Sequence, residues 1–172
     1  AEGELGDSDQ VDRASPIPVR GGHTFVAITA GWFHTCGLLA NGSAYCWGNN
    51  NDGELGTTAN NCTSGGWLCS DVPVPVAGGR QFAHIGAGAY HNCATTTPGD
   101  AYCWGAIIGG SSAPVAVPGG LTFASLSAGG SGYSCGVTTG RVAYCWGLNY
   151  SGQLGDGTTN DSNVPVRVAG QP

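Results

Sequence analysis

The sequence predicts an all-β protein made of β-propeller blades of four antiparallel strands: three full blades and an N-terminal half-blade. Three segments of the chain align with one another from Phe25, Phe82 and Phe123. Each segment carries a Cys-Trp-Gly motif at the same place, and its short apolar runs are separated by Gly, Pro and Asn. The spacing of the copies is close to the ~40–50 residues of a propeller blade, with extra length in the first copy.

Each copy has the same predicted order of strands. A strand with alternating apolar residues is followed by a turn with Gly, and a second strand runs through the first Cys of the copy. A tight turn then leads to a third strand that ends in Tyr-Cys-Trp-Gly, and a loop leads to a fourth strand. We expect the fourth strands at residues 72–76, 114–117 and 164–168. Prolines in these segments cannot donate to a strand ladder, so we expect the fourth strand at the outer edge of each blade.

The repeat sets the expected domain boundaries. Residues 3–22 match residues 152–170, so the chain opens in the outer part of a blade. We expect a half-blade of outer strands over residues 1–22 and a first blade over 23–80 with an insert at 57–71. The second and third blades are expected over 81–120 and 121–172. Three and a half blades cannot close a ring, so either the chain is part of a longer propeller or copies associate to cover the exposed end faces.

The repeated motifs resemble a known family. Gly-Trp-Phe-His-Thr-Cys at 31–36, Tyr-Cys-Trp-Gly-Asn at 45–49 and Asn-Tyr-Ser-Gly-Gln-Leu-Gly at 149–155 resemble the regulator of chromosome condensation repeat. The version with cysteines is similar to extracellular bacterial members. The resemblance implies a propeller fold and a binding role, but no particular partner. The second copy departs from it, with Ala-Ile-Ile-Gly-Gly-Ser-Ser at 106–112 in place of the last motif, and the third has Tyr133 where the others have His34 and His91.

The eight cysteines indicate disulfides. Three pairs, Cys36–Cys46, Cys93–Cys103 and Cys135–Cys145, share one spacing, which places both members opposite each other across a hairpin, within disulfide range. Cys62 and Cys69 would close the insert into a ring. Buried reduced cysteines remain an alternative, and zinc is less favoured because no Cys-x-x-Cys occurs. Disulfides predict an oxidising location: extracellular, periplasmic or at the cell surface.

Composition excludes several classes of function. The formal net charge is −6, and the five basic residues, all Arg, are scattered, so we expect no nucleic-acid partner. No apolar run approaches the ~20 residues of a transmembrane segment. We expect no cofactor and no metal. Asp7, Asp9 and Asp12 form an oxygen-rich loop that could hold Ca²⁺, but solvated turn residues are the favoured interpretation because the spacing of a calcium loop is missing.

No residue is predicted to be catalytic. His34 and His91 occupy equivalent positions, which favours a structural role in which each bonds a backbone group of its own blade. Trp47, Trp104 and Trp146 share one repeat position and are expected to pack between blades, with the indole N–H bonded to a carbonyl.

Two other tryptophans are candidate binding residues. Trp67 lies in the Cys62–Cys69 ring, on an insert that a propeller would push outward, and Trp32 also lies outside the repeat. An aromatic residue on a constrained exposed loop can anchor a partner, although packing against the blade is the alternative.

The leading functional hypothesis is a non-enzymatic extracellular binding or scaffold module that presents its loops to a protein or glycan. The first alternative is a structural subunit of a surface filament or another homo-oligomeric assembly. The second is a propeller enzyme, a lyase or a glycosidase, but the sequence contains no unrepeated set of acidic residues or histidines that would mark its site.

Overall fold

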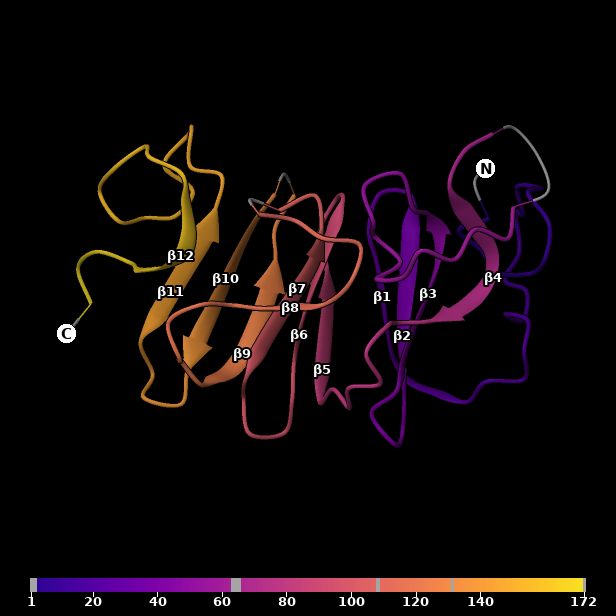
Figure 1. Ribbon diagram of the computed structural model, residues 1–172, viewed down its shortest axis with the longest axis horizontal. Helices are drawn as coiled ribbons and strands as arrows, with labels where there is room; N and C mark the ends of the chain where they lie inside the picture. Colours follow the sequence, from indigo (N-terminus) through magenta and orange to yellow (C-terminus); the bar gives the residue numbers. More distant parts are fainter. Residues whose placement is uncertain (1–2, 63–65, 108, 131, 172) are drawn as a thin grey trace.

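A computed structural model describes residues 3–62, 66–107, 109–130 and 132–171. The protein is all-β, and its described residues form three antiparallel sheets of four strands, as predicted (Figure 1). The first sheet contains β1 (Phe25–Ala30), β2 (His34–Leu39), β3 (Ala44–Asn49) and β4 (Cys69–Pro75). The second contains β5 (His84–Ala87), β6 (His91–Thr95), β7 (Ala101–Gly105) and β8 (Val115–Ala116). The third contains β9 (Phe123–Ala128), β10 (Tyr133–Thr138), β11 (Ala143–Gly147) and β12 (Ser162–Arg167).

The sheets stand side by side in chain order (Figure 1). Within each sheet the strand order follows the sequence, so β4, β8 and β12 are edge strands, as the prolines predicted. The first strands of neighbouring sheets pack together, β1 against β5 and β5 against β9. This arrangement places the loops between first and second strands and those between third and fourth strands at one end of the sheets, and the tight hairpin turns at the other.

The register of the hairpins brings the cysteines together. Cys36 faces Cys46, Cys93 faces Cys103 and Cys135 faces Cys145, with Cα–Cα distances of 4.1, 4.1 and 4.0 Å. All three pairs are disulfides, and a fourth disulfide joins Cys62 and Cys69 at the base of the insert. Because disulfides persist where thiols are not kept reduced, the four bonds indicate an oxidising compartment.

The glycine of each Cys-Trp-Gly motif is required by the backbone. Gly48, Gly105 and Gly147 have φ values of +98°, +93° and +110°. A Cβ at these positions would lie 2.3–2.5 Å from a carbonyl oxygen of the loop that precedes the second strand. A side chain would therefore clash there as well as strain the backbone, which explains why the motif ends in Gly in every copy.

The apolar core lies between the sheets. The first cluster joins Leu38, Leu55 and Val74 of the first sheet region to Phe82 and Trp104 of the second. A second cluster joins the disulfide Cys93–Cys103 to Phe123 and Trp146 of the third. Each junction thus buries a tryptophan of the later sheet against the sheet before it, as expected for the shared Trp position.

The N-terminal segment differs from expectation. Residues 3–22 contain no strand, although outer strands of a half-blade were predicted there. An outer strand pairs with the third strand of its own sheet, and the described chain has no such strand before residue 25. The segment instead packs on the first sheet, where Ser8 N donates to the Asp71 carbonyl at 2.9 Å. In the described part of the chain, no helix is long and apolar enough to span a membrane.

Candidate functional site: an aromatic hollow beside Trp32

Trp32 lies on the short loop between β1 and β2, and the backbone holds this loop in place. Gly31 N donates to the His34 carbonyl at 2.8 Å, which closes the loop. Trp32 N donates to the Ala89 carbonyl at 3.3 Å, which ties it to the equivalent loop of the second sheet. The Trp32 ring meets the edge of the Tyr90 ring at a centroid distance of 5.2 Å. The side chain is nevertheless 61% exposed, so Trp32 is a fixed aromatic surface rather than a core residue.

An open hollow of about 460 Å³ adjoins this ring. Its walls are Trp32 and four residues of the N-terminal segment, and we call it the Trp32 hollow: Glu4, Leu5, Asp12, Arg13 and Trp32. Leu5 is 40% exposed, so the hollow offers two apolar side chains beside charged ones. Pockets that combine apolar contact area with a few fixed polar groups are typical ligand sites.

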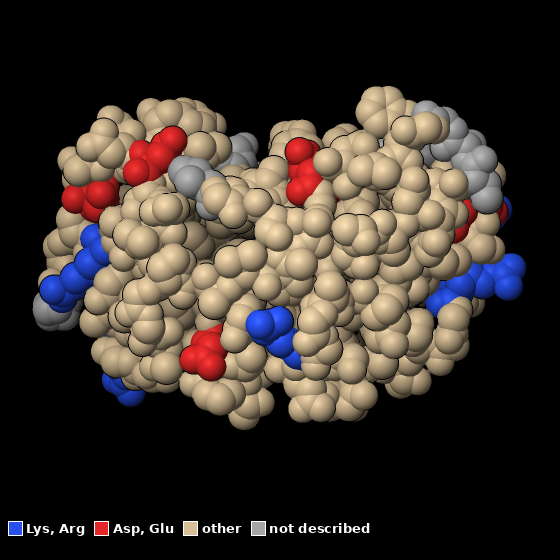
Figure 2. Space-filling view, viewed as in Figure 1, with Lys and Arg blue, Asp and Glu red and all other residues tan. Residues whose placement is uncertain are grey.

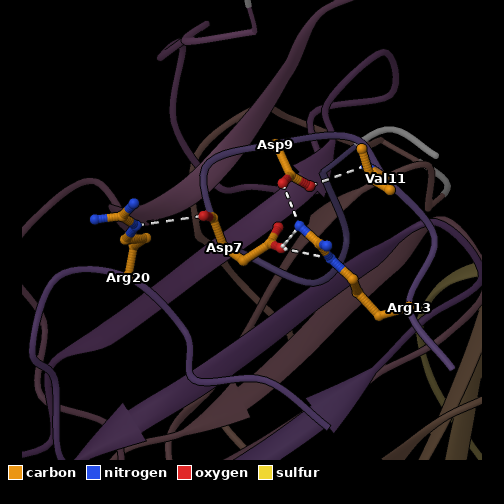
Figure 3. A network of polar contacts seen from close by, with 5 residues as sticks. All are labelled: Asp7, Asp9, Val11, Arg13 and Arg20. Carbon is orange, nitrogen blue, oxygen red and sulfur yellow. Dashed lines mark hydrogen bonds and ion pairs between the residues drawn. The ribbon is translucent and has the colours of Figure 1, made fainter. Parts of the chain in front are cut away.

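Acidic neighbours hold Arg13 in position (Figure 3). Its Nε donates to Asp7 Oδ2 at 3.4 Å, and its Nη2 lies 3.3 Å from the same oxygen and forms a close ion pair with Asp9. Asp9 also accepts a hydrogen bond from Val11 N at 2.9 Å, and Arg20 Nε donates to the Asp7 carbonyl at 3.3 Å. The pairing places two carboxylates beside one guanidinium, so Arg13 shapes the hollow without making it positive.

The floor of the hollow is also fixed. The Glu4 carbonyl accepts hydrogen bonds from Trp47 Nε1 at 2.7 Å and from Thr35 Oγ1 at 3.1 Å. Both donors belong to the first sheet, so the N-terminal wall cannot shift without breaking them. A preformed site loses less conformational entropy when a ligand binds.

Charged side chains are sparse on the surface of the sheets. On the face shown in Figure 2, the arginines lie apart from one another and most of the surface carries no charge. The residues that line the Trp32 hollow include two acidic ones, Glu4 and Asp12, and one basic one, Arg13, which is itself paired with Asp7 and Asp9. We therefore expect the hollow to prefer a ligand with apolar and basic groups over an anionic one.

Trp67, the other predicted binding residue, is 58% exposed on the insert between β3 and β4. The insert is partly outside the described residues, since 63–65 are not described. Trp67 is not among the residues that line the Trp32 hollow, so the two tryptophans form no common site. Both lie on loops at the same end of the sheets.

The two repeated histidines bond a side chain of the next sheet, not a backbone group of their own blade as expected. His34 Nε2 lies 3.1 Å from Asn92 Oδ1, and His91 Nε2 lies 2.9 Å from Ser134 Oγ. Burial lowers the pKa of His34, and the bond to Asn92 opposes this. For His91, burial and then the charge of His34 lower the pKa to about 4. Both are therefore neutral links between sheets at pH 7.

The oxygen-rich loop at Asp7 and Asp9, and the corresponding loops after β3 and β11, hold their own turns together. Asp7 and Asp9 bind Arg13, while Asp52 N donates to Glu54 Oε2 at 2.9 Å. In the loop between β11 and β12, Thr158 N donates to Asp156 Oδ1 at 2.9 Å, and this bond lowers the pKa of the Asp156 carboxyl. Among the described residues, no three His, Cys, Asp or Glu side chains form a group that could hold a metal ion.

Sequence reasoning named Trp32 as a candidate binding residue but did not name the other residues that line its hollow. Leu5 and Arg13 lie far from Trp32 in the chain, and no repeat pattern links them to it. One signal was present: Asp7 and Asp9 lie shortly before Arg13, so an ion-paired loop could have been proposed in place of solvated turn residues.

Comparison with protein families supports the repeat assignment. The family described as the regulator of chromosome condensation (RCC1) repeat matches residues 41–95 and 140–172. A second family of the same description matches residues 25–54.

Two plant proteins from Arabidopsis thaliana are similar in sequence. The ultraviolet-B receptor UVR8 is 30% identical over 105 residues, which cover 60% of this chain and 23% of that protein. The mitochondrial RCC1 domain-containing protein RUG3 is 33% identical over 93 residues, which cover 54% of this chain and 18% of that protein.

Solved structures share the fold at lower identity. Human WBSCR16 superposes with a TM-score of 0.83 at 21% identity, over 98% of this chain and 46% of that one. Prp20p from Saccharomyces cerevisiae superposes with a TM-score of 0.78 at 21% identity, over 96% of this chain and 44% of that one. The chain thus spans less than half the length of each of these four proteins.

Proposed function

We propose that this chain, which belongs to the regulator of chromosome condensation (RCC1) repeat family, is a non-enzymatic binding module that works in an extracellular, periplasmic or cell-surface location. The Trp32 hollow would be its contact site, and its partner would be a protein segment with an apolar side chain next to a basic one. The observation that carries the proposal is a tryptophan that is 61% exposed although its backbone is tied to two sheets.

The chemistry of the hollow favours a protein partner. Trp, Tyr and Arg are the residues that most often dominate binding energy at protein interfaces, and Trp32, Tyr90 and Arg13 are held here in one place. Yeast Prp20p has binding properties toward Gsp1p and histones, so this fold serves protein binding in a protein of similar structure. A glycan is the alternative partner, because a sugar ring could stack on Trp32 and bond Asp12.

The four disulfides support the proposed location, because disulfides persist where no reducing system cleaves them. Three of the disulfides also join the two strands of a hairpin, which restricts the movement of the strands that carry the loops. The Cys36–Cys46 bond lies in the same hairpin, β2–β3, that anchors the floor of the hollow.

A selection experiment tests the proposed function. A phage-displayed peptide library is selected on the immobilised protein, a glycan array is probed in parallel, and the ligands obtained are titrated against variants. We expect peptides with an aromatic or aliphatic residue next to Lys or Arg, and at least a tenfold loss of affinity in Trp32→Ala. Trp67→Ala is the matched control, because Trp67 is equally exposed but lies outside the hollow.

Two other outcomes would contradict the proposed contact site or the proposed class of partner. Ligands that bind Trp32→Ala as tightly as the wild type would refute the hollow as the contact site. Glycans that depend on Trp32, with no peptide selected, would replace the protein partner by a glycan.

A second candidate function rests on the exposed side of the first sheet. Val26 and Ile28 of β1 are 64% and 63% exposed, an unusual state for apolar residues of a sheet that packs against neighbours. Another blade, from a second copy in a homo-oligomeric filament or ring, would cover them. Native mass spectrometry at micromolar concentration tests this: assemblies that dissociate in Val26→Asp support it, and a monomer at all concentrations excludes it.

A further inference from the structure

The first two sheets recognise a backbone carbonyl in the same way. Trp47 Nε1 donates to the Glu4 carbonyl at 2.7 Å, and Trp104 Nε1 donates to the Glu54 carbonyl at 2.9 Å. Both acceptors belong to a Gly-Glu-Leu-Gly loop, at residues 3–6 and 53–56. Each tryptophan therefore holds a tight loop from an earlier part of the chain.

A second donor reaches each of these carbonyls. Thr35 lies opposite Trp47 in the strand register, and Asn92 lies opposite Trp104. Thr35 Oγ1 donates to the Glu4 carbonyl at 3.1 Å, and Asn92 Nδ2 donates to the Glu54 carbonyl at 2.7 Å. The repeat thus builds a two-donor receptor for one carbonyl.

The last glycine of each loop lies directly on the indole. Gly6 and Gly56 have φ values of +68° and +67°, and a Cβ there would lie 2.8 and 2.9 Å from the indole nitrogens of Trp47 and Trp104. The receptor therefore fits a loop that closes with Gly and leaves no room for a side chain at that position.

In the third sheet Ile107 of the preceding loop packs near Trp146, but no described residue provides a carbonyl for its indole N–H. Trp146 is 3% exposed and faces Ser134 in the register, as Trp104 faces Asn92. No described residue accepts a hydrogen bond from Trp146 Nε1. A buried N–H without an acceptor is unfavourable, and the equivalent groups of the other two sheets both have one.

The sequence of the second repeat explains the difference. Residues 106–112 read Ala-Ile-Ile-Gly-Gly-Ser-Ser and contain no Gly-x-Leu-Gly. In the other copies the last loop glycine is anchored through its carbonyl, which accepts a hydrogen bond from the backbone N–H of Arg20, Ala77 or Ala169. In the second copy the residue that corresponds to Ala77 is Pro118. The residues before them are equivalent, because Val117 N donates to the Ala101 carbonyl as Val76 N donates to the Ala44 carbonyl. Proline has no N–H, so this junction lacks the donor that anchors the last loop glycine in the other copies, and Trp146 Nε1 is left as the donor for a carbonyl there.

A pocket of about 160 Å³ adjoins Trp146 at this junction, and Ile107, Gly109 and Gly110 of the second repeat line it. We call it the junction pocket, and its side chains include Ile107, Val115, Val117, Pro118, Trp146 and Asn163. An apolar protein cavity of ~150 Å³ holds a benzene molecule, so the junction pocket has room for one peptide carbonyl and a small apolar group.

We propose that the junction pocket binds a loop of Gly-x-Leu-Gly type from another polypeptide, whose carbonyl accepts the hydrogen bond from Trp146 Nε1. A peptide loop is the occupant because the two equivalent receptors in this chain each hold one. The site is separate from the Trp32 hollow and shares no lining residue with it.

The indole N–H signals provide a direct test. The ¹⁵N-labelled protein is titrated with N-acetyl-Gly-Glu-Leu-Gly-amide to millimolar concentration, and the indole cross-peaks are followed after assignment with Trp146→Phe. We expect a saturable downfield shift of the Trp146 signal, because a hydrogen bond forms at Nε1. The signals of Trp47 and Trp104 should stay in place, because their carbonyl acceptors are already bound.

A pocket-filling variant keeps the test independent of Trp146. Val115 lines the junction pocket and is half-exposed on β8, so Val115→Phe should fold and weaken peptide binding at least tenfold. Val164→Phe, at a similarly exposed valine of β12 outside the pocket, should bind like the wild type. An unmoved Trp146 signal, or equal affinity in Val115→Phe and the wild type, would overturn the proposal.

Discussion

Acid should destabilise this protein through His91. The side chain is fully buried, and its Nε2 lies 2.9 Å from Ser134 Oγ of the third sheet. Burial, reinforced by the charge of His34, lowers its pKa from 6.5 to about 4. The folded protein therefore keeps His91 neutral at pH values at which the unfolded chain protonates it.

The sign and size of the effect follow from proton linkage. The stability due to neutral His91 is complete above pH 6.5, the unfolded value, and is lost as the pH falls toward the folded value of about 4. A shift of this size corresponds to about 3 kcal/mol in total, and about 2 kcal/mol of it is lost between about pH 7 and pH 5. His34 adds to the loss in the same direction, since burial lowers its pKa too.

Urea unfolding, followed by tryptophan fluorescence at pH 7, 6 and 5 with the disulfides intact, measures this loss. His91→Gln keeps an amide that can bond Ser134 but does not titrate, so its unfolding free energy should depend less on pH by about 2 kcal/mol over this range. His84→Gln, at an exposed histidine of the same sheet, is the matched control and should behave like the wild type. If His91→Gln and the wild type lose stability in parallel, the buried neutral His91 is not the cause.

Two further predictions concern stability. Replacement of both Cys93 and Cys103 by Ala should lower the unfolding free energy in urea by about 3 kcal/mol, because the bond closes a loop with a sequence separation of 10, and an unchanged midpoint would contradict this. Trp104→Phe removes a hydrogen bond to the Glu54 carbonyl, whereas Trp146→Phe removes an indole N–H that has no described acceptor. Trp104→Phe should therefore cost about 1 kcal/mol more than Trp146→Phe in urea unfolding, and equal costs would show that the Trp104 bond contributes nothing net.

Much of the blade could be predicted from the sequence because its contacts are local. Cys36 and Cys46 face each other because a hairpin between them fixes the register, and the same spacing recurs twice. The glycine after each tryptophan and the outer position of the proline-bearing strands follow in the same way from backbone geometry within one sheet. Outer strands were predicted at 3–22 from the repeat motif, but the structure describes no strand there. A strand needs a partner strand, and the motif could not show that the described residues provide no partner for this segment.

The sequence by itself therefore determined the strands of each sheet, their order and the disulfides that join them. The tertiary structure alone decided the contacts between sheets, such as the hydrogen bonds from His34 to Asn92 and from Trp104 to the Glu54 carbonyl. It also decided that Leu5 and Arg13 lie beside Trp32 and that Trp146 lines a pocket. The physical reason is that a repeat encodes the contacts that every copy makes within itself. Contacts between copies depend on which two sequences meet at a junction, and a single altered loop, residues 106–112, changes the outcome at one junction only.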